Sequence, residues 1–249
     1  MQITQSNIFL QTLVKYVQSG RLVPAAFQRP YRWTEEDVMA LFDSILLRYP
    51  IGAFLFWSPY GQADLTKVGR GRLGPIVSAP DPLRSSLLLD GQNRLASMAW
   101  LMRDPAEPLP DNMSEQELAT WGTGKRVVLD LEQERILFVP ENEADKGFRM
   151  PAQAVFDSRV ANRQVRARWD RQWGGYSSDF KNSKMKWLDD SIDAFGFAKV
   201  VVTDLENATV EEARDAFRHI CKVGVPMSVE DLEASLAWAF PPGTIGDIA

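Results

Sequence analysis

The residues best suited to chemistry follow a short apolar run, in the stretch LLLDGQNRL at residues 87–95. This pattern predicts a strand that passes through Asp90 and Gly91 into the first turn of a helix. Such a junction leaves unpaired backbone N–H groups at the positive end of the helix dipole, which suits a phosphate. Gly91 would let the backbone approach the phosphate closely, and Arg94, one turn along, would neutralise its charge. We therefore interpret the junction as a candidate phosphate-binding turn.

The carboxylate of Asp90 needs a role of its own, because it would repel a bare phosphate. One role is to hold a Mg²⁺ ion that bridges to the phosphates, and another is to cap the following helix. In the purely structural alternative, Asp90 is only a helix cap and the side chains of Gln92 and Arg94 are solvated. The spacing of these residues is compatible with both.

A second cluster of polar and aromatic side chains, FQRPYRW at residues 27–33, precedes a predicted helix cap at Thr34. Its arginines and glutamine could grip a phosphate, and its aromatic rings could stack on a base. Equally, Pro30 and Trp33 could anchor the segment to the core.

A basic segment at residues 159–187 has eight lysines and arginines against two aspartates, with three tryptophans and a tyrosine between them. Cations that follow phosphates, together with aromatic rings, are typical of nucleic-acid binding. The candidate nucleic-acid ligands are Arg163, Arg166, Arg168 and Arg171. The alternative is a solvated helix face whose tryptophans belong to the core, since a helix places some of these arginines on opposite faces.

Composition excludes several classes of site. The only histidine, His219, excludes zinc sites with several histidines and His-Asn-His nucleases, and the only cysteine, Cys221, excludes a disulfide framework. These two residues are two apart on a predicted helix, so we do not expect a catalytic dyad. The formal net charge of -5 means that any contact with DNA must use a local basic patch. Without an apolar run of about 18 residues or a cleavable leader, we expect a cytoplasmic protein that does not contact a membrane.

The elements that must position these residues are predicted from periodicity and capping signals. With 45% hydrophobic residues the chain is expected to fold. The predictions are a helix over residues 6–18, a helix from a Thr34/Asp37 capping box to Tyr49, a strand over 51–57, a long mobile basic loop over 58–86, a strand over 86–89, a helix over 91–102, a hairpin of strands 126–131 and 135–139, a last strand over 197–203, and a helix from a Thr209/Glu212 capping box to Gly224.

Five motifs then carry a resemblance to a known family. FQRPYRW, SILLRYPIG with FLFW, LLLDGQNRL, VVLDLE and AFRHICKVGVPMSVEDL occur in the order found in the GmrSD-type N-terminal domain family. The chain resembles that family over about residues 5–240. The family has a ParB/sulfiredoxin-like core and belongs to bacterial restriction systems that act against phage. Its Asp-Gly-Gln-Gln-Arg motif is associated with binding and hydrolysis of nucleoside triphosphates, so the resemblance implies that activity here.

The resemblance also implies roles for individual residues. The family motif matches Asp90, Gly91, Gln92 and Arg94, and the family's earlier Gln-Arg pair matches Gln28 and Arg29. Two positions depart from the family. Asn93 replaces the second glutamine of the motif, and Cys221 stands where the family has an asparagine. Both departures concern hydrolysis more than binding.

We therefore predict an α+β protein, with a small mixed sheet of ParB/sulfiredoxin-like type surrounded by helices. Residues 1–249 would form one GmrSD-type domain, with a core at 1–140, a mainly helical half at 141–249, and no C-terminal His-Asn-His nuclease domain. The expected cofactors are Mg²⁺, held by Asp90, and a nucleoside triphosphate.

The predicted function is that of a sensor or regulatory component that binds and hydrolyses a nucleoside triphosphate. Asp90, Gln92 and Arg94 would be catalytic, and Gln28, Arg29, Gly91 and Asn93 would bind the nucleotide. Expected partners are the nucleotide, DNA and a separate nuclease subunit. The main alternative is a non-enzymatic DNA-binding adaptor that recruits the nuclease. A third hypothesis, direct nuclease activity with Asp90 as a metal ligand, ranks lowest because no convincing set of acidic metal ligands accompanies it.

Overall fold

The computed structural model describes residues 1–26, 30–59, 69–81, 85–104 and 106–222. Contacts divide the chain into two units, Met1–Ala213 and Arg214–Ala249. The second unit begins inside helix α8 (Val210–Lys222), and most of it lies outside the described residues. The architecture below is that of the first unit.

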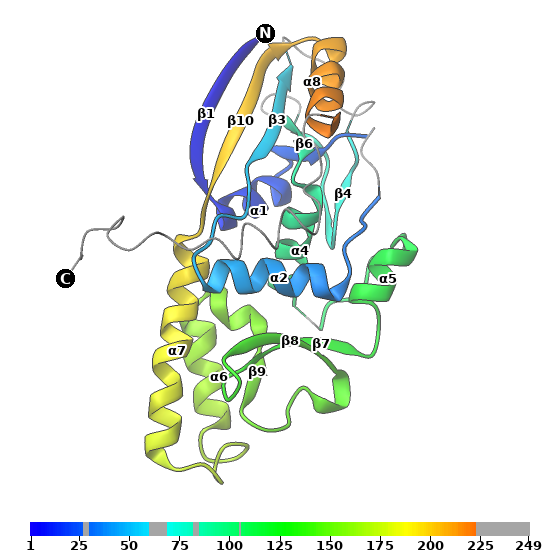
Figure 1. Ribbon diagram of the computed structural model, residues 1–249. Helices are drawn as coiled ribbons and strands as arrows, with labels where there is room; N and C mark the ends of the chain where they lie inside the picture. The colour runs from blue at the N-terminus through cyan, green and yellow to red at the C-terminus, as the bar shows by residue number, and fades with distance from the viewer. Residues whose placement is uncertain (27–29, 60–68, 82–84, 105, 223–249) are drawn as a thin grey trace, which may run out of the picture. The chain divides into compact units, whose positions relative to one another are not determined.

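A five-stranded mixed sheet forms one layer of this unit, with the strand order β1-β10-β3-β6-β2 (Figure 1). Its strands are β1 (Gln2–Phe9), β2 (Leu22–Pro24), β3 (Phe54–Pro59), β6 (Ser86–Asp90) and β10 (Lys199–Ala208). β10 pairs antiparallel with β1 and parallel with β3, while β6 pairs antiparallel with β3 and parallel with β2. This mixed sheet and its helices confirm the predicted α+β class.

The remaining strands form two smaller sheets. One is a hairpin of β4 (Arg72–Leu73) and β5 (Ile76–Val77), and the other has the order β8-β7-β9, with β7 (Lys125–Asp130), β8 (Arg135–Pro140) and β9 (Arg149–Pro151). The antiparallel pair β7–β8 confirms the predicted hairpin.

The helices of the described residues include the predicted helix after Asp90. They are α1 (Leu10–Gln18), α2 (Glu35–Leu46), α4 (Gln92–Met102), α5 (Glu115–Trp121), α6 (Ser158–Arg168) and α7 (Ser178–Phe197), with the 3-10 helices η1 (Glu141–Glu143) and η2 (Ala152–Phe156). None of the helices in the described part of the chain is long and apolar enough to cross a membrane.

The N-terminal prediction of a helix over residues 6–18 is wrong for its first turn. Ser6 to Phe9 belong to β1, where Ser6 lies opposite Val202 of β10. The helix begins only at Leu10, and its buried side chains are Leu10, Leu13, Val14 and Val17. Pairing with a strand almost 200 residues away satisfies the backbone of Ser6 to Phe9, and this pairing outweighs the local helical spacing.

The predicted loop over residues 58–86 is also different where it is described. Residues 72–77 form the β4–β5 hairpin, and Ala25 makes an isolated bridge to Gly69. Residues 60–68 and 82–84 of that prediction lie outside the described residues. The last strand is longer than the predicted 197–203, and it pairs between β1 and β3, so the large sheet takes a strand from outside residues 1–140.

Both capping boxes form as predicted. Thr34 Oγ1 accepts from the backbone N–H of Asp37, and the Asp37 carboxylate accepts from the N–H of Thr34 at 2.8 Å. The Thr209 hydroxyl and the Glu212 carboxylate make the same reciprocal pair at the start of α8. The predicted end of α8 at Gly224 lies outside the described residues.

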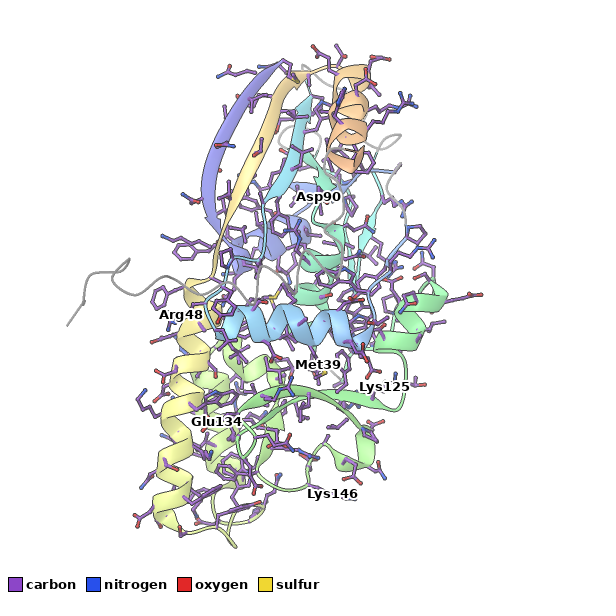
Figure 2. All side chains as sticks on the ribbon, viewed as in Figure 1. Met39, Arg48, Asp90, Lys125, Glu134 and Lys146 are labelled. Carbon is purple, nitrogen blue, oxygen red and sulfur yellow. The ribbon has the colours of Figure 1, made fainter. Side chains whose placement is uncertain are left out.

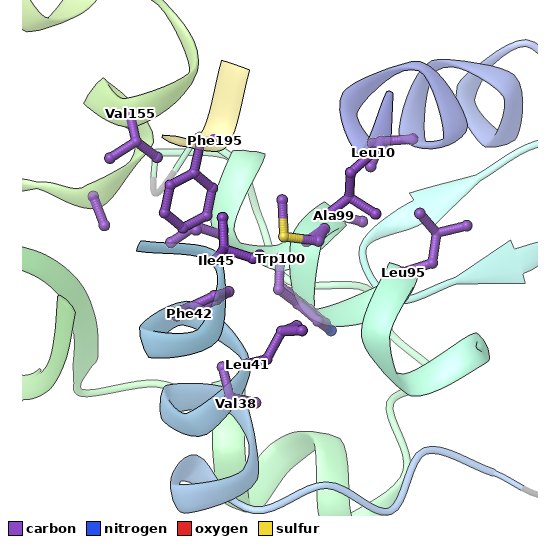
Figure 3. Packing of buried hydrophobic residues seen from close by; sticks show 14 of the residues in the cluster. Leu10, Val38, Leu41, Phe42, Ile45, Leu95, Ala99, Trp100, Val155 and Phe195 are labelled. Atoms are coloured by element: carbon purple, nitrogen blue, oxygen red, sulfur yellow. The ribbon is translucent and has the colours of Figure 1, made fainter. Parts of the chain in front are cut away.

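The core that holds α4 in place is apolar and is formed by several helices. α1 and α2 both contact α4. Figure 3 shows Leu10 of α1, Phe42 and Ile45 of α2 and Leu95 of α4 around one interior. These side chains are at most 3% exposed. The helix that follows Asp90 is therefore rigidly anchored along its buried length.

Candidate functional site

The strand β6 passes into α4 through a left-handed glycine. Asp90 ends the strand, and Gly91 is the N-cap with φ 99°. A Cβ atom at Gly91 would lie 2.3 Å from Cδ1 of Phe54, so the ring packs directly against the glycine backbone. Figure 2 marks Asp90 where the strand gives way to the helix. The alternative in which Asp90 caps the helix is wrong, because the N-cap residue of α4 is Gly91.

The Arg94 side chain is directed into the protein, where its guanidinium donates hydrogen bonds to three protein oxygens. Its guanidinium donates to the carbonyl oxygens of Ile51 at 2.7 Å and Ala53 at 2.8 Å, and to Oδ2 of Asp90 at 3.0 Å. The side chain is only 15% exposed, and its Cζ lies 4.7 Å from the centre of the Phe54 ring. The alternative in which Arg94 is solvated is therefore wrong.

Gly52 makes this position of Arg94 possible, and the sequence reasoning missed it. Gly52 has φ 83°, and a Cβ atom there would lie 2.5 Å from Nη1 of Arg94. Gly52 lies between Ile51 and Ala53, whose carbonyl oxygens both accept from Arg94. The glycine at this position is the sequence signal that could have indicated the contact. Burial lowers the pKa of Arg94, and the charge of Asp90 opposes that shift.

Asp90 remains half accessible at this junction. Its side chain is 49% exposed, and only Oδ2 accepts from Arg94. Arg94 thus orients the carboxylate while leaving part of it open to a ligand.

The segment before α2 is tied to the first turn of α4. Asn93 Oδ1 accepts from the backbone N–H of Arg32 at 3.2 Å, and the Tyr31 hydroxyl lies 2.8 Å from Oγ of Ser97 on α4. The two clusters singled out in the sequence therefore lie side by side. Gln28 and Arg29, which were expected to bind the nucleotide, lie outside the described residues.

Tyr31 is the buried centre of this connection. It is 4% exposed, and its hydroxyl also accepts from Nε1 of Trp121 at 3.1 Å. Burial raises the pKa of Tyr31 to about 12. Tyr31 was not among the predicted site residues. The signal that could have found it is its position between Arg29 and Arg32 in the segment FQRPYRW. Trp33 packs partly buried against the core, as the anchoring alternative predicted.

A pocket of about 620 Å³ opens where these segments meet. Its walls come from four stretches of chain: Pro30 and Tyr31, the residues from Arg70 to Val77, Gln92 and Ala96 of α4, and the residues from Asn112 to Glu117. Oε1 of Gln92 is buried and has no hydrogen-bond partner within the described part of the chain. A buried amide oxygen of this kind is suited to a donor from a ligand.

An ion pair holds two walls of the pocket together. Arg72 of β4 makes two hydrogen bonds to the Glu117 carboxylate, at 3.0 and 2.7 Å, and it also donates to the carbonyl oxygens of Gly74 and Asn112. The Glu117 side chain is 4% exposed. Neither Asp90 nor Arg94 lines this pocket, which places Gln92 on one side of the α4 turn and the Asp90–Arg94 pair on another.

A family model described as the GmrSD restriction endonuclease, N-terminal domain, matches residues 10–237. The chain belongs to this family. An uncharacterized protein of Methanocaldococcus jannaschii is 31% identical over 115 residues, which are 44% of this chain and 19% of that protein. The chain thus matches about a fifth of the length of that relative.

In this member of the GmrSD family, Asp90 is the residue at the β6–α4 junction that could hold a Mg²⁺ ion. No group of three or more His, Cys, Asp or Glu side chains that could hold a metal occurs among the described residues. Mg²⁺ is commonly held by one or two carboxylates together with substrate phosphates. One half-exposed carboxylate beside a helix N-terminus therefore fits an ion that arrives with a nucleotide, and it does not fit a site built from protein ligands alone.

The basic segment separates into a core side and a solvent side. Trp173 is fully buried, and Trp169, Tyr176 and Trp187 pack partly buried against the core, as the structural alternative predicted. Of the four arginines expected to bind nucleic acid, Arg163, Arg166 and Arg171 are exposed. Arg168 differs: its side chain is 13% exposed and pairs with Asp145 at 2.9 Å. His219 is exposed, while the side chain of Cys221 lies outside the described residues.

Proposed function

We propose that this chain is the nucleoside triphosphate-binding and hydrolysing regulatory component of a DNA restriction system. The observation that carries the proposal is the pocket at Gln92, where the Asp-Gly-Gln-Asn-Arg segment meets Pro30 and Tyr31. Two stretches picked out by their chemistry in the sequence thus share one cavity. Its volume of about 620 Å³ lies in the range of small-molecule sites.

The lining of the pocket supports a nucleotide as its occupant. Gln92 offers a buried carbonyl oxygen that accepts no hydrogen bond from any described residue. The walls combine apolar groups such as Met113 and Val77 with polar ones such as Asn112. In the proposed complex, the amide of Gln92 holds a polar edge of the base or ribose, and the apolar walls hold its faces.

The phosphates would extend over the first turn of α4 toward Asp90. The N–H groups of that turn have no intrahelical acceptor, and Asp90 would hold Mg²⁺ against the phosphates. The ion, when bound, supplies charge neutralisation for the phosphates. The contacts of Arg94 favour a positioning role over the direct phosphate contact that the sequence suggested, because its guanidinium already donates to Ile51, Ala53 and Asp90.

The experiment measures binding of the four common triphosphates to the full chain by calorimetry, with and without Mg²⁺, and then phosphate release. Gln92→Ala is expected to weaken binding by about 10-fold or more, because it removes the only side-chain amide of α4 in the pocket. Asp90→Asn is expected to abolish the Mg²⁺ dependence and phosphate release. Gln18→Ala and Asp189→Asn change exposed residues of the same types and serve as controls.

Two results would overturn this proposal. Wild-type protein that binds none of the four triphosphates excludes the nucleotide site. Equal affinities for Gln92→Ala and Gln18→Ala would show that the ligand binds elsewhere.

The alternative function is a non-enzymatic adaptor that binds DNA and recruits a separate nuclease. The exposed arginines of α6 favour it, because they give a chain of net charge -5 a local basic surface. The adaptor predicts DNA binding that is unchanged in Gln92→Ala and no phosphate release by wild-type protein. The two functions can also coexist in one chain.

A further inference from the structure

Strand β1 forms an open edge of the five-stranded sheet. It pairs with β10 along one side, and no strand in the described part of the chain pairs with its other side (Figure 1). The hydrogen bond from the backbone N–H of Leu10 to the carbonyl oxygen of Ala198 continues the β1–β10 register. Because alternate residues of an antiparallel strand bond to the same neighbour, the backbone groups of Ile3, Gln5 and Asn7 face the open side. Their N–H and C=O groups are therefore available to a further strand.

The features by which proteins usually protect a sheet edge do not occur in β1. Its eight residues, QITQSNIF, include no charged residue and no proline, and their register with β10 has no bulge. The opposite edge of the sheet differs, because β2 has only three residues, which are buried and end at Pro24. The fold thus protects one edge and leaves the other open to pairing.

Exposed apolar side chains gather around this open edge. Nine large hydrophobic side chains are exposed among the described residues, and four of them lie in β1, directly before it or opposite it in β10: Met1, Ile3, Phe9 and Val201. Alternation along the strand puts Ile3 and Phe9 on the same face of the sheet. Val201 shares that face, because it lies opposite Asn7. Apolar groups that gather beside an open edge are typical of a surface that another protein covers.

We propose that β1 pairs antiparallel with β1 of a second copy of this chain, so that two five-stranded sheets join into one sheet of ten strands. Open sheets reach about this size. The backbone groups along the edge specify an extended strand as the occupant. The absence of charge indicates which strand: a partner selected by its charges finds none to pair with, whereas a second β1 places no like charge opposite its own.

One register of this pair bonds all the outward backbone groups of the strand. With the two-fold axis at Gln5, that residue lies opposite the partner's Gln5, and Ile3 lies opposite the partner's Asn7. A shift of two residues in either direction would draw in Phe9 or Met1. Phe9 is the N-cap of α1, so its carbonyl oxygen already accepts within the helix, and Met1 precedes the strand. The central register also places the exposed ring of Phe9 opposite the partner's Met1.

Pairing of this kind ends at two copies. Both copies use the same edge, so the contact closes about its two-fold axis. The edges that remain are the two short β2 strands, which are buried. No residue of β1 lines the pocket at Gln92, and the inference does not rest on the proposed function.

The first test is sedimentation equilibrium of the full chain at concentrations up to about 100 μM, where wild type is expected to have twice the mass of one chain. The variant Q5K/N7K should dimerise at least about 10-fold more weakly, because four like charges meet across the axis, and added salt should recover part of the loss. The control Q18K/N182K makes the same substitutions at exposed residues outside β1 and should dimerise like wild type.

The second test measures the register and leaves the charge of the strand unchanged. In a Cys221→Ser background, Gln5→Cys is expected to form a covalent dimer on oxidation, because the Cα atoms of directly opposite residues lie about 5.5 Å apart. Gln2→Cys is the matched control. In the proposed register the two copies of residue 2 are roughly 20 Å apart, so no crosslink should form.

Four outcomes would overturn the inference. A wild-type protein that stays monomeric at about 100 μM would leave the edge to a different chain. Equal dimerisation of the two lysine variants would place the interface elsewhere. Equal crosslinking of Gln5→Cys and Gln2→Cys would exclude the two-fold pair at Gln5. A mass that rises beyond two copies would contradict a closed contact.

Discussion

At the junction of Asp90 and Gly91, the absence of a side chain on Gly91 allows the backbone conformation that connects the strand to the helix. Gly91 adopts φ 99° and lets the Phe54 ring lie against its backbone. The guanidinium of Arg94 lies over the same ring and donates a hydrogen bond to the Asp90 carboxylate. The positions of Asp90, Gly91 and Arg94 are thus coupled by direct contacts in the folded protein.

Gly91→Ala is expected to lower the free energy of unfolding by at least about 2 kcal/mol, because it combines a left-handed backbone with a steric clash against Phe54. Gly196→Ala provides the matched control. It lies in α7 with open space around its Cα, so alanine should leave stability unchanged or raise it by up to about 1 kcal/mol. Urea unfolding of both variants measures the difference, and equal stabilities would contradict the role of Gly91.

At the scale of elements, the large sheet presents a row of polar side chains across four strands. Thr4 donates to Glu206 at 2.9 Å, Ser58 donates to Asp204 Oδ2 at 2.8 Å, and the hydroxyls of Ser58 and Ser86 are 2.8 Å apart. Alternation along each strand puts these residues on one face. Burial raises the pKa of Asp204, the Ser58 hydrogen bond opposes the shift, and the charge of Glu206 adds to it.

Asp204→Asn is expected to stabilise the protein relative to wild type as pH rises. The folded-state pKa of Asp204 is above its unfolded value, so its contribution to stability is present at low pH and is lost as pH rises through the folded pKa. Asparagine keeps an acceptor for Ser58 and has no such loss. Thermal unfolding between about pH 4 and pH 7 should show a growing difference in Tm. A difference that stays constant with pH would contradict this account.

At the scale of the whole molecule, the pocket gathers segments that are distant in the chain. Pro30 and Tyr31, the β4–β5 hairpin, α4 and the start of α5 each contribute a wall. A ligand bound there contacts all four segments and favours the folded unit over the unfolded chain.

A saturating nucleotide should therefore stabilise the protein against unfolding. At about 100 times its Kd, the gain is expected to be about 2.7 kcal/mol in wild type and also in the Gln18→Ala control. At the same concentration, Gln92→Ala should gain less. Thermal unfolding with and without nucleotide checks this, and an equal gain in all three proteins would place the ligand outside the pocket.

The sequence by itself determined the elements whose causes are local. The capping box of Thr34 and Asp37, the strand and helix that flank Asp90, and the hairpin of β7 and β8 depend on residues within a few positions of one another. The motif order also identified the family, because it is a property of the chain alone.

Only the tertiary structure decided where the chemistry-bearing side chains point. Ser6 to Phe9 became a strand because β10 pairs with them, and Arg94 turned inward because Gly52 leaves room beside the carbonyls of Ile51 and Ala53. The core contacts of Val165 decided which arginines of α6 face solvent. In each case the deciding partners lie far away in the sequence or depend on a buried face, so no local pattern contains them.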